Sequence, residues 1–371
     1  MIHNNCLGII FANMHDEFLG EMTSRRTTGS VPFGGRYRLI DFALSNLVNS
    51  GISTVGVITK HNYASLMDHL GSGRSWDLAR KRGGLVMLPP YGRPGTGVYN
   101  SRLEALSGAA GFLSTRSEEY VLMTDTNVVA NMDFSDVLKY HKDSGADVTL
   151  VYKETKMPTE SGRYRVLETK KDRVTDILIN PKTSENVKLV LGVTVMSRKA
   201  VLELCDETNS RGLQDMVRDY FKKNMDSLKI MAYEFKGYAE FVTSQKSYYE
   251  ANMNLLCDEN RENLFIEGSP IYTKVRDDFP ASYGIDSKVK NSIVADGCII
   301  EGTVENSILF RGVTVKKGAV VRDCILMQGS EIGENCKIEY AITDKNVVVS
   351  EYKAVSGTRD YPIYFAKGKK V

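Results

Sequence analysis

Short apolar runs alternate with amphipathic stretches through the first two thirds of the chain. The runs predict buried strands at residues 7–12, 55–58, 120–123, 148–152, 189–195 and 230–233. Apolar residues at helical spacing predict helices at 40–49 and 246–256, and Gly51 follows the first of them as a helix stop. This alternation is typical of a mostly parallel sheet covered by helices. We therefore expect an α/β domain over residues 1–256.

The pattern changes after a segment with few periodic signals at residues 257–284, which we interpret as a linker. Similar tripeptides at 291–293, 306–308, 323–325 and 340–342 begin repeated units of about three hexapeptides each. Apolar residues recur six positions apart, as at Ile293 and Ile299, at Val313, Ala319 and Ile325, and at Ile332 and Ile338. Each hexapeptide supplies one short strand of a triangular prism, with the repeated aliphatic side chain inside. We predict a left-handed parallel β-helix at residues 285–371.

The composition excludes several classes of protein. Of the 371 residues, 25% are charged and 42% hydrophobic, with a formal net charge of +2, so no polyanionic partner is indicated. No basic stretch interleaved with aromatics argues for nucleic acid. The six cysteines form no CxxC pair and predict buried free thiols in a reducing compartment. No apolar run reaches about 18 residues and no signal-peptide pattern opens the chain. We expect a cytoplasmic protein without a membrane segment.

One segment carries a specific resemblance. Residues 31–46 read Val-Pro-Phe-Gly-Gly-Arg-Tyr-Arg-Leu-Ile-Asp-Phe-Ala-Leu-Ser-Asn, and shorter stretches at 56–59, 132–135 and 248–252 agree with it. The chain resembles the bacterial glucose-1-phosphate adenylyltransferase family over nearly its whole length. The resemblance implies a Rossmann-like nucleotidyltransferase domain followed by a β-helix. Active members of the family join ATP to glucose 1-phosphate and release pyrophosphate, with Mg²⁺ between paired aspartates.

The family's phosphate loop, GGxGTRL, falls on residues 13–19, where this chain departs from it. Glycines let backbone N–H groups approach a phosphate, and a cation assists them. Here the loop positions hold Asn13 and Met14, and the arginine position holds Phe18. Two carboxylates, Asp16 and Glu17, would face the triphosphate. We therefore expect that the loop does not hold ATP in the family's manner.

Other elements of the same chemistry are missing downstream. The first metal aspartate survives as Asp125, but the second falls on Phe241, which leaves half of a Mg²⁺ site. The family's GTADA segment falls on residues 101–105 and loses its glycine. The pyrophosphate-contacting lysine and the charged pair of the sugar-phosphate EKP segment fall on Thr28, Ile179 and Asn180. We expect no functional catalytic residue and no cofactor on this chain.

These losses are similar to those of the family's non-catalytic, regulatory subunit. The resemblance then implies a catalytic partner subunit, a hetero-oligomer that we expect to be a tetramer, and a role in glycogen biosynthesis. A weakly active adenylyltransferase with a rearranged site is the alternative, so activity of the chain itself stays open. A β-helix acyltransferase would need a histidine base, and no histidine follows His141. A scaffold unrelated to sugar nucleotides would lack the match at 31–46.

A few residues could still bind a ligand. Asp125 and Tyr99 occupy the family's metal and nucleotide positions, and each could instead be a packed relic. Arg25 and Arg26 match a basic pair that contributes to the effector site in family members with anionic effectors. Lys60 stands at a family position tied to activation. An anionic effector is the expected ligand, and a solvated basic surface is the alternative.

Overall fold

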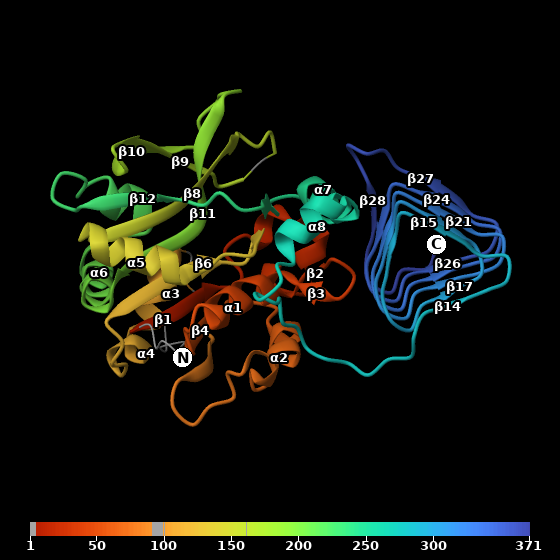
Figure 1. Cartoon of the computed structure of the whole chain (residues 1–371), viewed down its shortest axis with the longest axis horizontal. Coiled ribbons are helices and arrows are strands. Elements are labelled where there is room, and N and C mark those ends of the chain that lie inside the picture. Colours follow the sequence, from red (N-terminus) through yellow and green to blue (C-terminus); the bar gives the residue numbers. More distant parts are fainter. Residues whose placement is uncertain (1–4, 91–98, 100, 161) are drawn as a thin grey trace.

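A computed structural model describes residues 5–90, 99, 101–160 and 162–371 of the chain. An α/β domain and a β-helix lie side by side, and the prism of the β-helix is seen end-on in Figure 1. The large sheet of the first domain has nine strands in the order β5-β4-β1-β6-β11-β8-β12-β10-β9. Its strands are β1 (Cys6–Phe11), β4 (Thr54–Ile58), β5 (Gly84–Leu88), β6 (Tyr120–Asp125), β8 (Val148–Lys156), β9 (Arg165–Lys170), β10 (Arg173–Ile179), β11 (Asn186–Ser197) and β12 (Ile230–Glu234).

The row β5-β4-β1-β6 is parallel, as the sequence predicts. Its two inner strands, β4 and β1, are buried on both faces, which explains their unbroken apolar runs. The other half is mixed, because β11 runs antiparallel to β6 and β8, and β10 runs antiparallel to β12 and β9. We did not predict β5, β9 and β10 from the sequence: β5 is a short apolar run, and β9 and β10 carry several polar residues.

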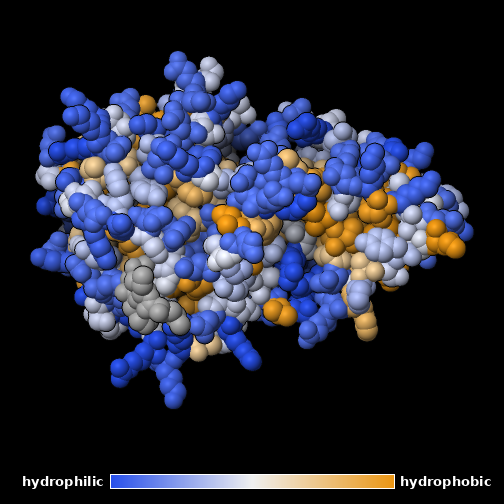
Figure 2. Space-filling model, viewed as in Figure 1, coloured by the Kyte–Doolittle hydropathy of each residue, from blue (hydrophilic) through white to orange (hydrophobic). Residues whose placement is uncertain are grey.

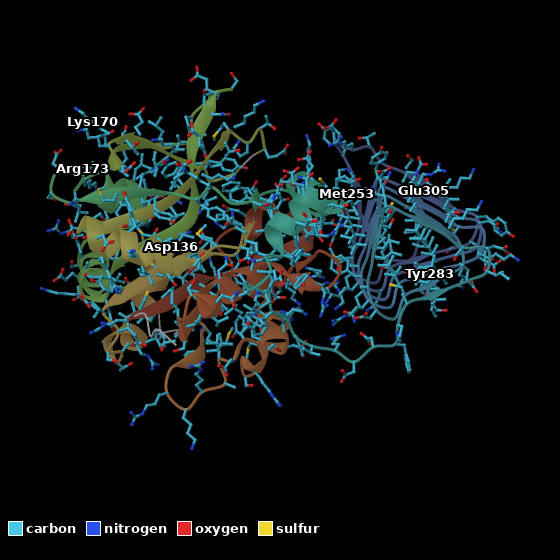
Figure 3. The ribbon with its side chains drawn as sticks, in the orientation of Figure 1. Asp136, Lys170, Arg173, Met253, Tyr283 and Glu305 are labelled. Atoms are coloured by element: carbon cyan, nitrogen blue, oxygen red, sulfur yellow. The ribbon has the colours of Figure 1, made fainter. Side chains whose placement is uncertain are left out.

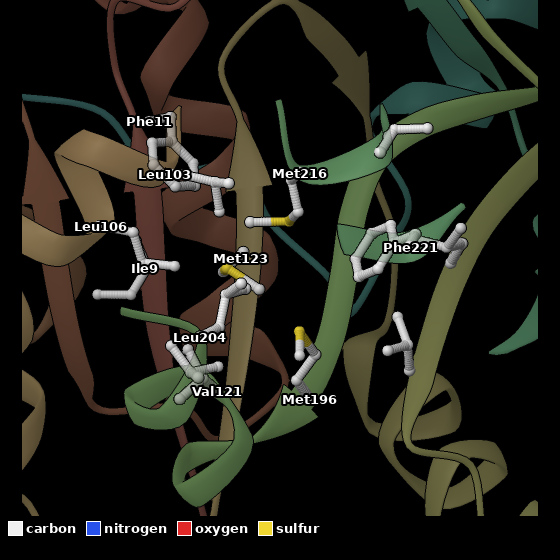
Figure 4. Packing of buried hydrophobic residues seen from close by; sticks show 14 of the residues in the cluster. Ile9, Phe11, Leu103, Leu106, Val121, Met123, Met196, Leu204, Met216 and Phe221 are labelled. Carbon is white, nitrogen blue, oxygen red and sulfur yellow. The ribbon is translucent and has the colours of Figure 1, made fainter. Parts of the chain in front are cut away.

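Helices cover both faces of the sheet. The helices are α1 (Leu39–Asn49), α2 (Ala64–Leu70), α3 (Arg102–Gly108), α4 (Ala110–Ser114), α5 (Phe134–Ser144) and α6 (Arg198–Arg211), with a π-helical turn at Met216–Phe221. One face packs on α1, α2 and α5, and the other on α3 and α6. Figure 4 shows the second core, in which β1, β6 and β11 meet α3 and α6 through Ile9, Phe11, Leu103, Leu106, Val121, Met123, Met196 and Leu204.

Small paired strands and 3-10 turns complete the first domain. β2 (Pro32–Phe33) pairs with β3 (Tyr37–Arg38), and β7 (Val128–Ala130) pairs with β13 (Ala239–Phe241). The 3-10 turns lie at Asp16–Phe18, Gly20–Thr23, Thr28–Ser30 and Arg74–Trp76. At the tip of the β9–β10 hairpin, Lys170 and Arg173 project outward (Figure 3).

The C-terminal region is a parallel β-helix with three faces of five strands each. The faces are β14-β17-β20-β23-β26, β15-β18-β21-β24-β27 and β16-β19-β22-β25-β28. The strands are β14 (Ser282–Tyr283), β15 (Lys288–Lys290), β16 (Ile293–Val294), β17 (Ile299–Ile300), β18 (Thr303–Glu305), β19 (Ile308–Leu309), β20 (Thr314–Val315), β21 (Val320–Arg322), β22 (Ile325–Leu326), β23 (Glu331–Ile332), β24 (Lys337–Glu339), β25 (Ala341–Thr343), β26 (Val348–Val349), β27 (Ala354–Ser356) and β28 (Ile363–Phe365).

The sequence repeat corresponds to one corner of the prism. The residues that open the predicted units, Asn291, Asn306, Asp323 and Tyr340, all have φ between +45° and +49°. Their left-handed conformation turns the chain between faces in each coil. Most of the predicted inward residues are fully buried, but Ile299 is 48% exposed, so its assignment was wrong. Its neighbours Cys298 and Ile300 point inward instead, because Ile299 is in register with Thr314 and Glu331 of the later coils, which are not buried either.

A third core joins the two domains. Phe33, Phe42 and Tyr248 of the first domain pack with Phe310 and Met327 of the β-helix. The predicted C-terminal helix is α7 (Gln245–Met253), followed by a 3-10 turn at Asn254–Leu256. The segment at 257–284, interpreted from its pattern as a linker, contains α8 (Asp258–Leu264) and the whole of β14, the first β-helix strand. The helix is short and polar, so its pattern gave no signal.

The cysteines and the surface match only in part what we predicted from the composition. All six cysteines are free and five are buried, whereas Cys257 is exposed, contrary to the expectation of burial. In the described part of the chain no helix is long and apolar enough to cross a membrane. The face drawn in Figure 2 is mainly hydrophilic, and hydrophobic residues show near the junction with the β-helix and on it.

Candidate functional site

Asp125 ends β6 at the carboxyl edge of the parallel strands, where ligands bind in open α/β sheets. The register of the sheet places it opposite Phe11, the last residue of β1. Its side chain is 4% exposed. Gly192 of β11 leaves room for the carboxylate, because a Cβ there would lie 2.7 Å from Asp125 Oδ2. Asp125 is therefore enclosed by the protein.

A cation of the chain itself neutralises this carboxylate. Arg102 donates from Nη2 to both oxygens of Asp125, and His15 Nε2 lies 3.4 Å from Oδ2. Ser101 caps α3 by accepting a hydrogen bond from the Glu104 backbone, which sets Arg102 as the first helical residue. Burial alone would raise the pKa of Asp125, but the Arg102 charge and the His15 contact outweigh it and hold the pKa well below its usual range.

In the loop after β1, where the resemblance places the family's phosphate loop, the Asp16 carboxylate binds donors of the chain itself. Asp16 Oδ1 accepts hydrogen bonds from the backbone N–H and the hydroxyl of Thr28, at 2.6 and 2.7 Å. The resemblance places the family's phosphate-contacting lysine at Thr28. We expected Asp16 and Glu17 to face the ligand space, but Asp16 turns inward and Glu17 pairs with Arg163 at 2.7 Å. A carboxylate of the chain thus occupies donors that could otherwise meet an anion.

Asp16 should make the stability of the fold depend on pH. Burial raises its pKa to about 6, against the hydrogen bonds from Thr28. The stability that the protonated Asp16 contributes is therefore fully present below about pH 4 and is lost as pH rises through about 6. We expect Asp16→Asn, which keeps an acceptor for Thr28, to raise the free energy of unfolding by about 1–2 kcal/mol above pH 7 and to leave it unchanged near pH 4. Urea unfolding across this range measures the difference.

The control for this prediction is Asp16→Ala, which removes the acceptor as well as the charge. It should lower stability near pH 4 by about 1–3 kcal/mol, because the Thr28 donors lose their partner, and the loss should shrink above pH 7, where removal of the buried charge offsets it. A pH-independent effect of Asp16→Asn would contradict the assignment.

Phe241, at which the resemblance places the family's second metal aspartate, lies beside Asp125. β13 brings it opposite Val128 of β7, and its side chain lines the same small cavity as Asp125 and His15. A magnesium ion needs oxygen ligands at this place. The only carboxylate there belongs to Asp125, which Arg102 already holds, and no group of three metal-ligating side chains occurs among the described residues. These residues do not fit a bound magnesium ion.

The segment that replaces the family's sugar-phosphate motif is tied to its neighbour. Asn180, at φ +49°, accepts the Tyr164 N–H at 2.7 Å and donates its own N–H to the Tyr164 carbonyl at 3.0 Å. Ile179 packs against the core of the sheet and lines a cavity. The side-chain amide of Asn180 therefore hydrogen-bonds to the backbone of the neighbouring segment.

Tyr99 and Lys60 are brought together by the fold. The Tyr99 hydroxyl donates to the Thr59 carbonyl, and Lys60 Nζ lies 5.8 Å from the centre of the Tyr99 ring. The contact is a cation–π arrangement. Met14 and Asn13 lie in the loop after β1, with Met14 against the hydrophobic core and Asn13 buried. Phe18 lies under the guanidinium of Arg163, 5.9 Å from it.

The two arginines expected at an effector site separate. Arg25 is exposed, whereas Arg26 is buried and pairs with Asp344 of the β-helix at 2.7 Å. Cations from other segments line a cleft between the domains: Arg36, Arg38, Lys274, Arg276, Arg311 and Lys345. Burial and the nearby arginines lower the pKa of Lys345 to about 7. Sequence reasoning missed this set, because its members come from distant parts of the chain.

Sequence reasoning also missed Arg102 and His15. The stretch at 101–105 was read only for its lost glycine, although it introduces an arginine. A signal was present. If Phe241 replaces the second metal aspartate, no metal ion would neutralise the buried Asp125, which then needs another cation. The sequence could not say which of the chain's arginines supplies it.

Comparison with known proteins agrees with this geometry. The Nucleotidyl transferase family matches residues 17–257, and the GlmU-like, C-terminal hexapeptide family matches residues 279–360. The glycogen biosynthesis protein GlgD of Bacillus subtilis (strain 168) is 35% identical over 369 residues, which are 99% of this chain and 97% of the relative. The glucose-1-phosphate adenylyltransferase of Bacillus mycoides (strain KBAB4) is 34% identical over 372 residues, 98% of each chain.

Proposed function

The chain belongs to the nucleotidyl transferase family, next to GlgD and the glucose-1-phosphate adenylyltransferases, and from this premise we propose that it is a regulatory, catalytically silent subunit of a glucose-1-phosphate adenylyltransferase. Its role would be to modulate a catalytic partner that makes ADP-glucose from ATP and glucose 1-phosphate. The names of the relatives support a role in glycogen biosynthesis.

One observation carries the proposal: groups of the chain itself occupy both positions that the family's chemistry needs. Arg102 holds Asp125 where a metal ion would bind, and Asp16 holds the Thr28 donors where phosphate would bind. Each contact is buried or partly buried, so a substrate would have to break it and leave a charge without a partner. Phe241 removes the second carboxylate in addition. Such a site favours a catalytically silent chain over a weakly active enzyme.

The proposal extends to partner, ligand and compartment. We place the chain in a hetero-oligomer with the catalytic subunit, expected to be a tetramer, in the cytoplasm. An anionic effector would bind the cationic cleft between the domains, which six lysine and arginine side chains line. Magnesium has no part in the function of this chain.

The test compares three preparations: this chain alone, the catalytic subunit alone, and the two co-purified. We expect no measurable ADP-glucose synthesis by this chain, against about 1–1000 turnovers per second for ordinary enzymes. The co-purified pair should differ from the catalytic subunit by about fivefold or more in rate or in effector response, the lower end of usual couplings.

A pair built with a catalytic subunit that lacks its metal aspartate serves as the control. It should be inactive, because all turnover comes from the partner. Ordinary turnover by this chain alone would sink the proposal in favour of an active enzyme with a rearranged site.

A further inference from the structure

Lys345 directly follows Asp344 in the chain and lines the cleft between the domains. The carboxylate of Asp344 is already taken by other donors. Arg26 donates to both of its oxygens, Tyr364 donates to Oδ2 at 2.6 Å, and the backbone N–H of Lys345 donates to Oδ1 at 2.6 Å. Among the residues that the structure describes, no ion pair or hydrogen bond of Lys345 Nζ is found. The amine is therefore half-buried without a partner.

The cleft around this amine is strongly cationic. Lysine and arginine side chains from distant segments line it together with Lys345: Arg36, Arg38, Lys274, Arg276 and Arg311. No aspartate or glutamate is found among its described lining residues. Acids from outside reach two of the cations, because Lys274 pairs with Asp68 at 3.4 Å and Arg311 lies 3.9 Å from Asp278 and Asp296. The interior of the cleft therefore attracts an anion.

The free space of the cleft is small. It measures about 50 Å³, which is room for about three to five water molecules. A phosphate group suits such a space and matches the forked donors of the arginines. The ligand that fits is therefore a phosphate with a small substituent.

Lys345 is poised to act as a nucleophile. Burial and the charges of Arg38 and Arg26 lower its pKa to about 7, with Lys367 acting in the same sense and Asp344 in the opposite one. About half of the Lys345 side chains are then neutral at pH 7, against roughly one in 2,500 for a lysine of ordinary pKa. Only the neutral amine has a lone pair for nucleophilic attack. The five other cations of the cleft outnumber the two negative charges of a phosphate, so a bound phosphate does not cancel the field that keeps the amine neutral.

We propose that Lys345 is a modification site, acylated at Nζ by a small acyl phosphate whose phosphate group is held by the cations of the cleft. The lone pair of the neutral amine attacks the carbonyl carbon and forms the N–C bond. The C–O bond to the phosphate then breaks, and inorganic phosphate leaves with that electron pair and takes up the proton that the amine releases. The arginines stabilise the negative charge of the leaving group. The products are an amide and hydrogen phosphate, so no oxidant or reductant is needed.

Acylation changes the charge of the cleft. The amide is neutral, so the cleft keeps five of its six positive side chains. An anion is then held less strongly, because one source of attraction is lost. The inference concerns a covalent modification of this chain by itself and does not rest on the proposed regulatory function.

The experiment treats the full chain with acetyl phosphate near neutral pH and follows the acetylation of each lysine by peptide mass spectrometry. We expect Lys345 to react at least about tenfold faster than Lys199, because more of its amine is neutral and the cleft holds the reagent beside it. Lys199 is the reference because its side chain is 87% exposed. The rate at Lys345 should saturate with acetyl phosphate, fall when inorganic phosphate competes, and level off above about pH 8.

Acetic anhydride, which carries no phosphate, separates binding in the cleft from the reactivity of the amine. Its reaction with Lys345 should not respond to inorganic phosphate. Arg276→Gln, at an exposed residue of the cleft, should slow acetylation by acetyl phosphate about fivefold or more and leave the reaction with the anhydride unchanged. Arg211→Gln, on the exposed face of α6, should change neither reaction.

Two results would overturn the assignment. One is that acetyl phosphate modifies Lys345 no faster than Lys199. The other is that neither inorganic phosphate nor Arg276→Gln slows the modification of Lys345, since the cations of the cleft would then not hold the reagent.

Discussion

Arg102→Ala is expected to lower the free energy of unfolding by about 3–5 kcal/mol at neutral pH, the usual cost of leaving one partner of a buried ion pair. Asp125 would keep only His15, 3.4 Å away, as a partner for its buried charge. Urea unfolding measures the loss. The loss should shrink on acidification, because the isolated carboxyl takes up a proton that the native ion pair excludes.

Two control variants sharpen this prediction. The double variant Arg102→Leu/Asp125→Leu removes both charges and should recover most of the stability, since an apolar pair of similar volume replaces the ion pair. Arg211→Ala breaks the exposed pair with Glu207 and should cost less than about 1 kcal/mol. If Arg102→Ala were as mild as Arg211→Ala, Arg102 would not be the internal counter-ion of the site.

Arg26→Ala is expected to weaken the junction between the domains by a similar amount, about 3–5 kcal/mol. Arg26 Nη2 donates to both oxygens of Asp344, at 2.7 and 2.8 Å, and the side chains of this pair are 6% and 3% exposed. Tyr364 also donates to Asp344, at 2.6 Å, and cannot neutralise its charge. We expect the thermal unfolding of the variant to begin earlier and to separate into two transitions.

The neighbouring residue supplies a matched control. Arg25 is exposed, so Arg25→Ala should change stability by less than about 0.5 kcal/mol. Equal effects of the two substitutions on unfolding would contradict the interpretation of Arg26 as a link between domains.

The sequence by itself determined the features that depend on local order. Buried strands such as β1 and β4 appear as unbroken apolar runs, because both of their faces are covered. The repeat in the β-helix reports the corners at Asn306 and Asp323, because each coil meets the same backbone requirement. The losses at Asn13 and Phe241 are equally local, since a missing glycine or carboxylate can be read at its own position.

Only the tertiary structure decided what replaces the lost chemistry. His15 and Asp125 are 110 positions apart, and Arg26 and Asp344 are 318 apart, yet each pair is in contact. No spacing rule connects such residues, because their approach depends on strand order and on how the two domains pack. An ion pair also depends on burial, which sets its strength and is a property of the surroundings. The sequence therefore shows that a charge needs a partner, and the fold selects which one it receives.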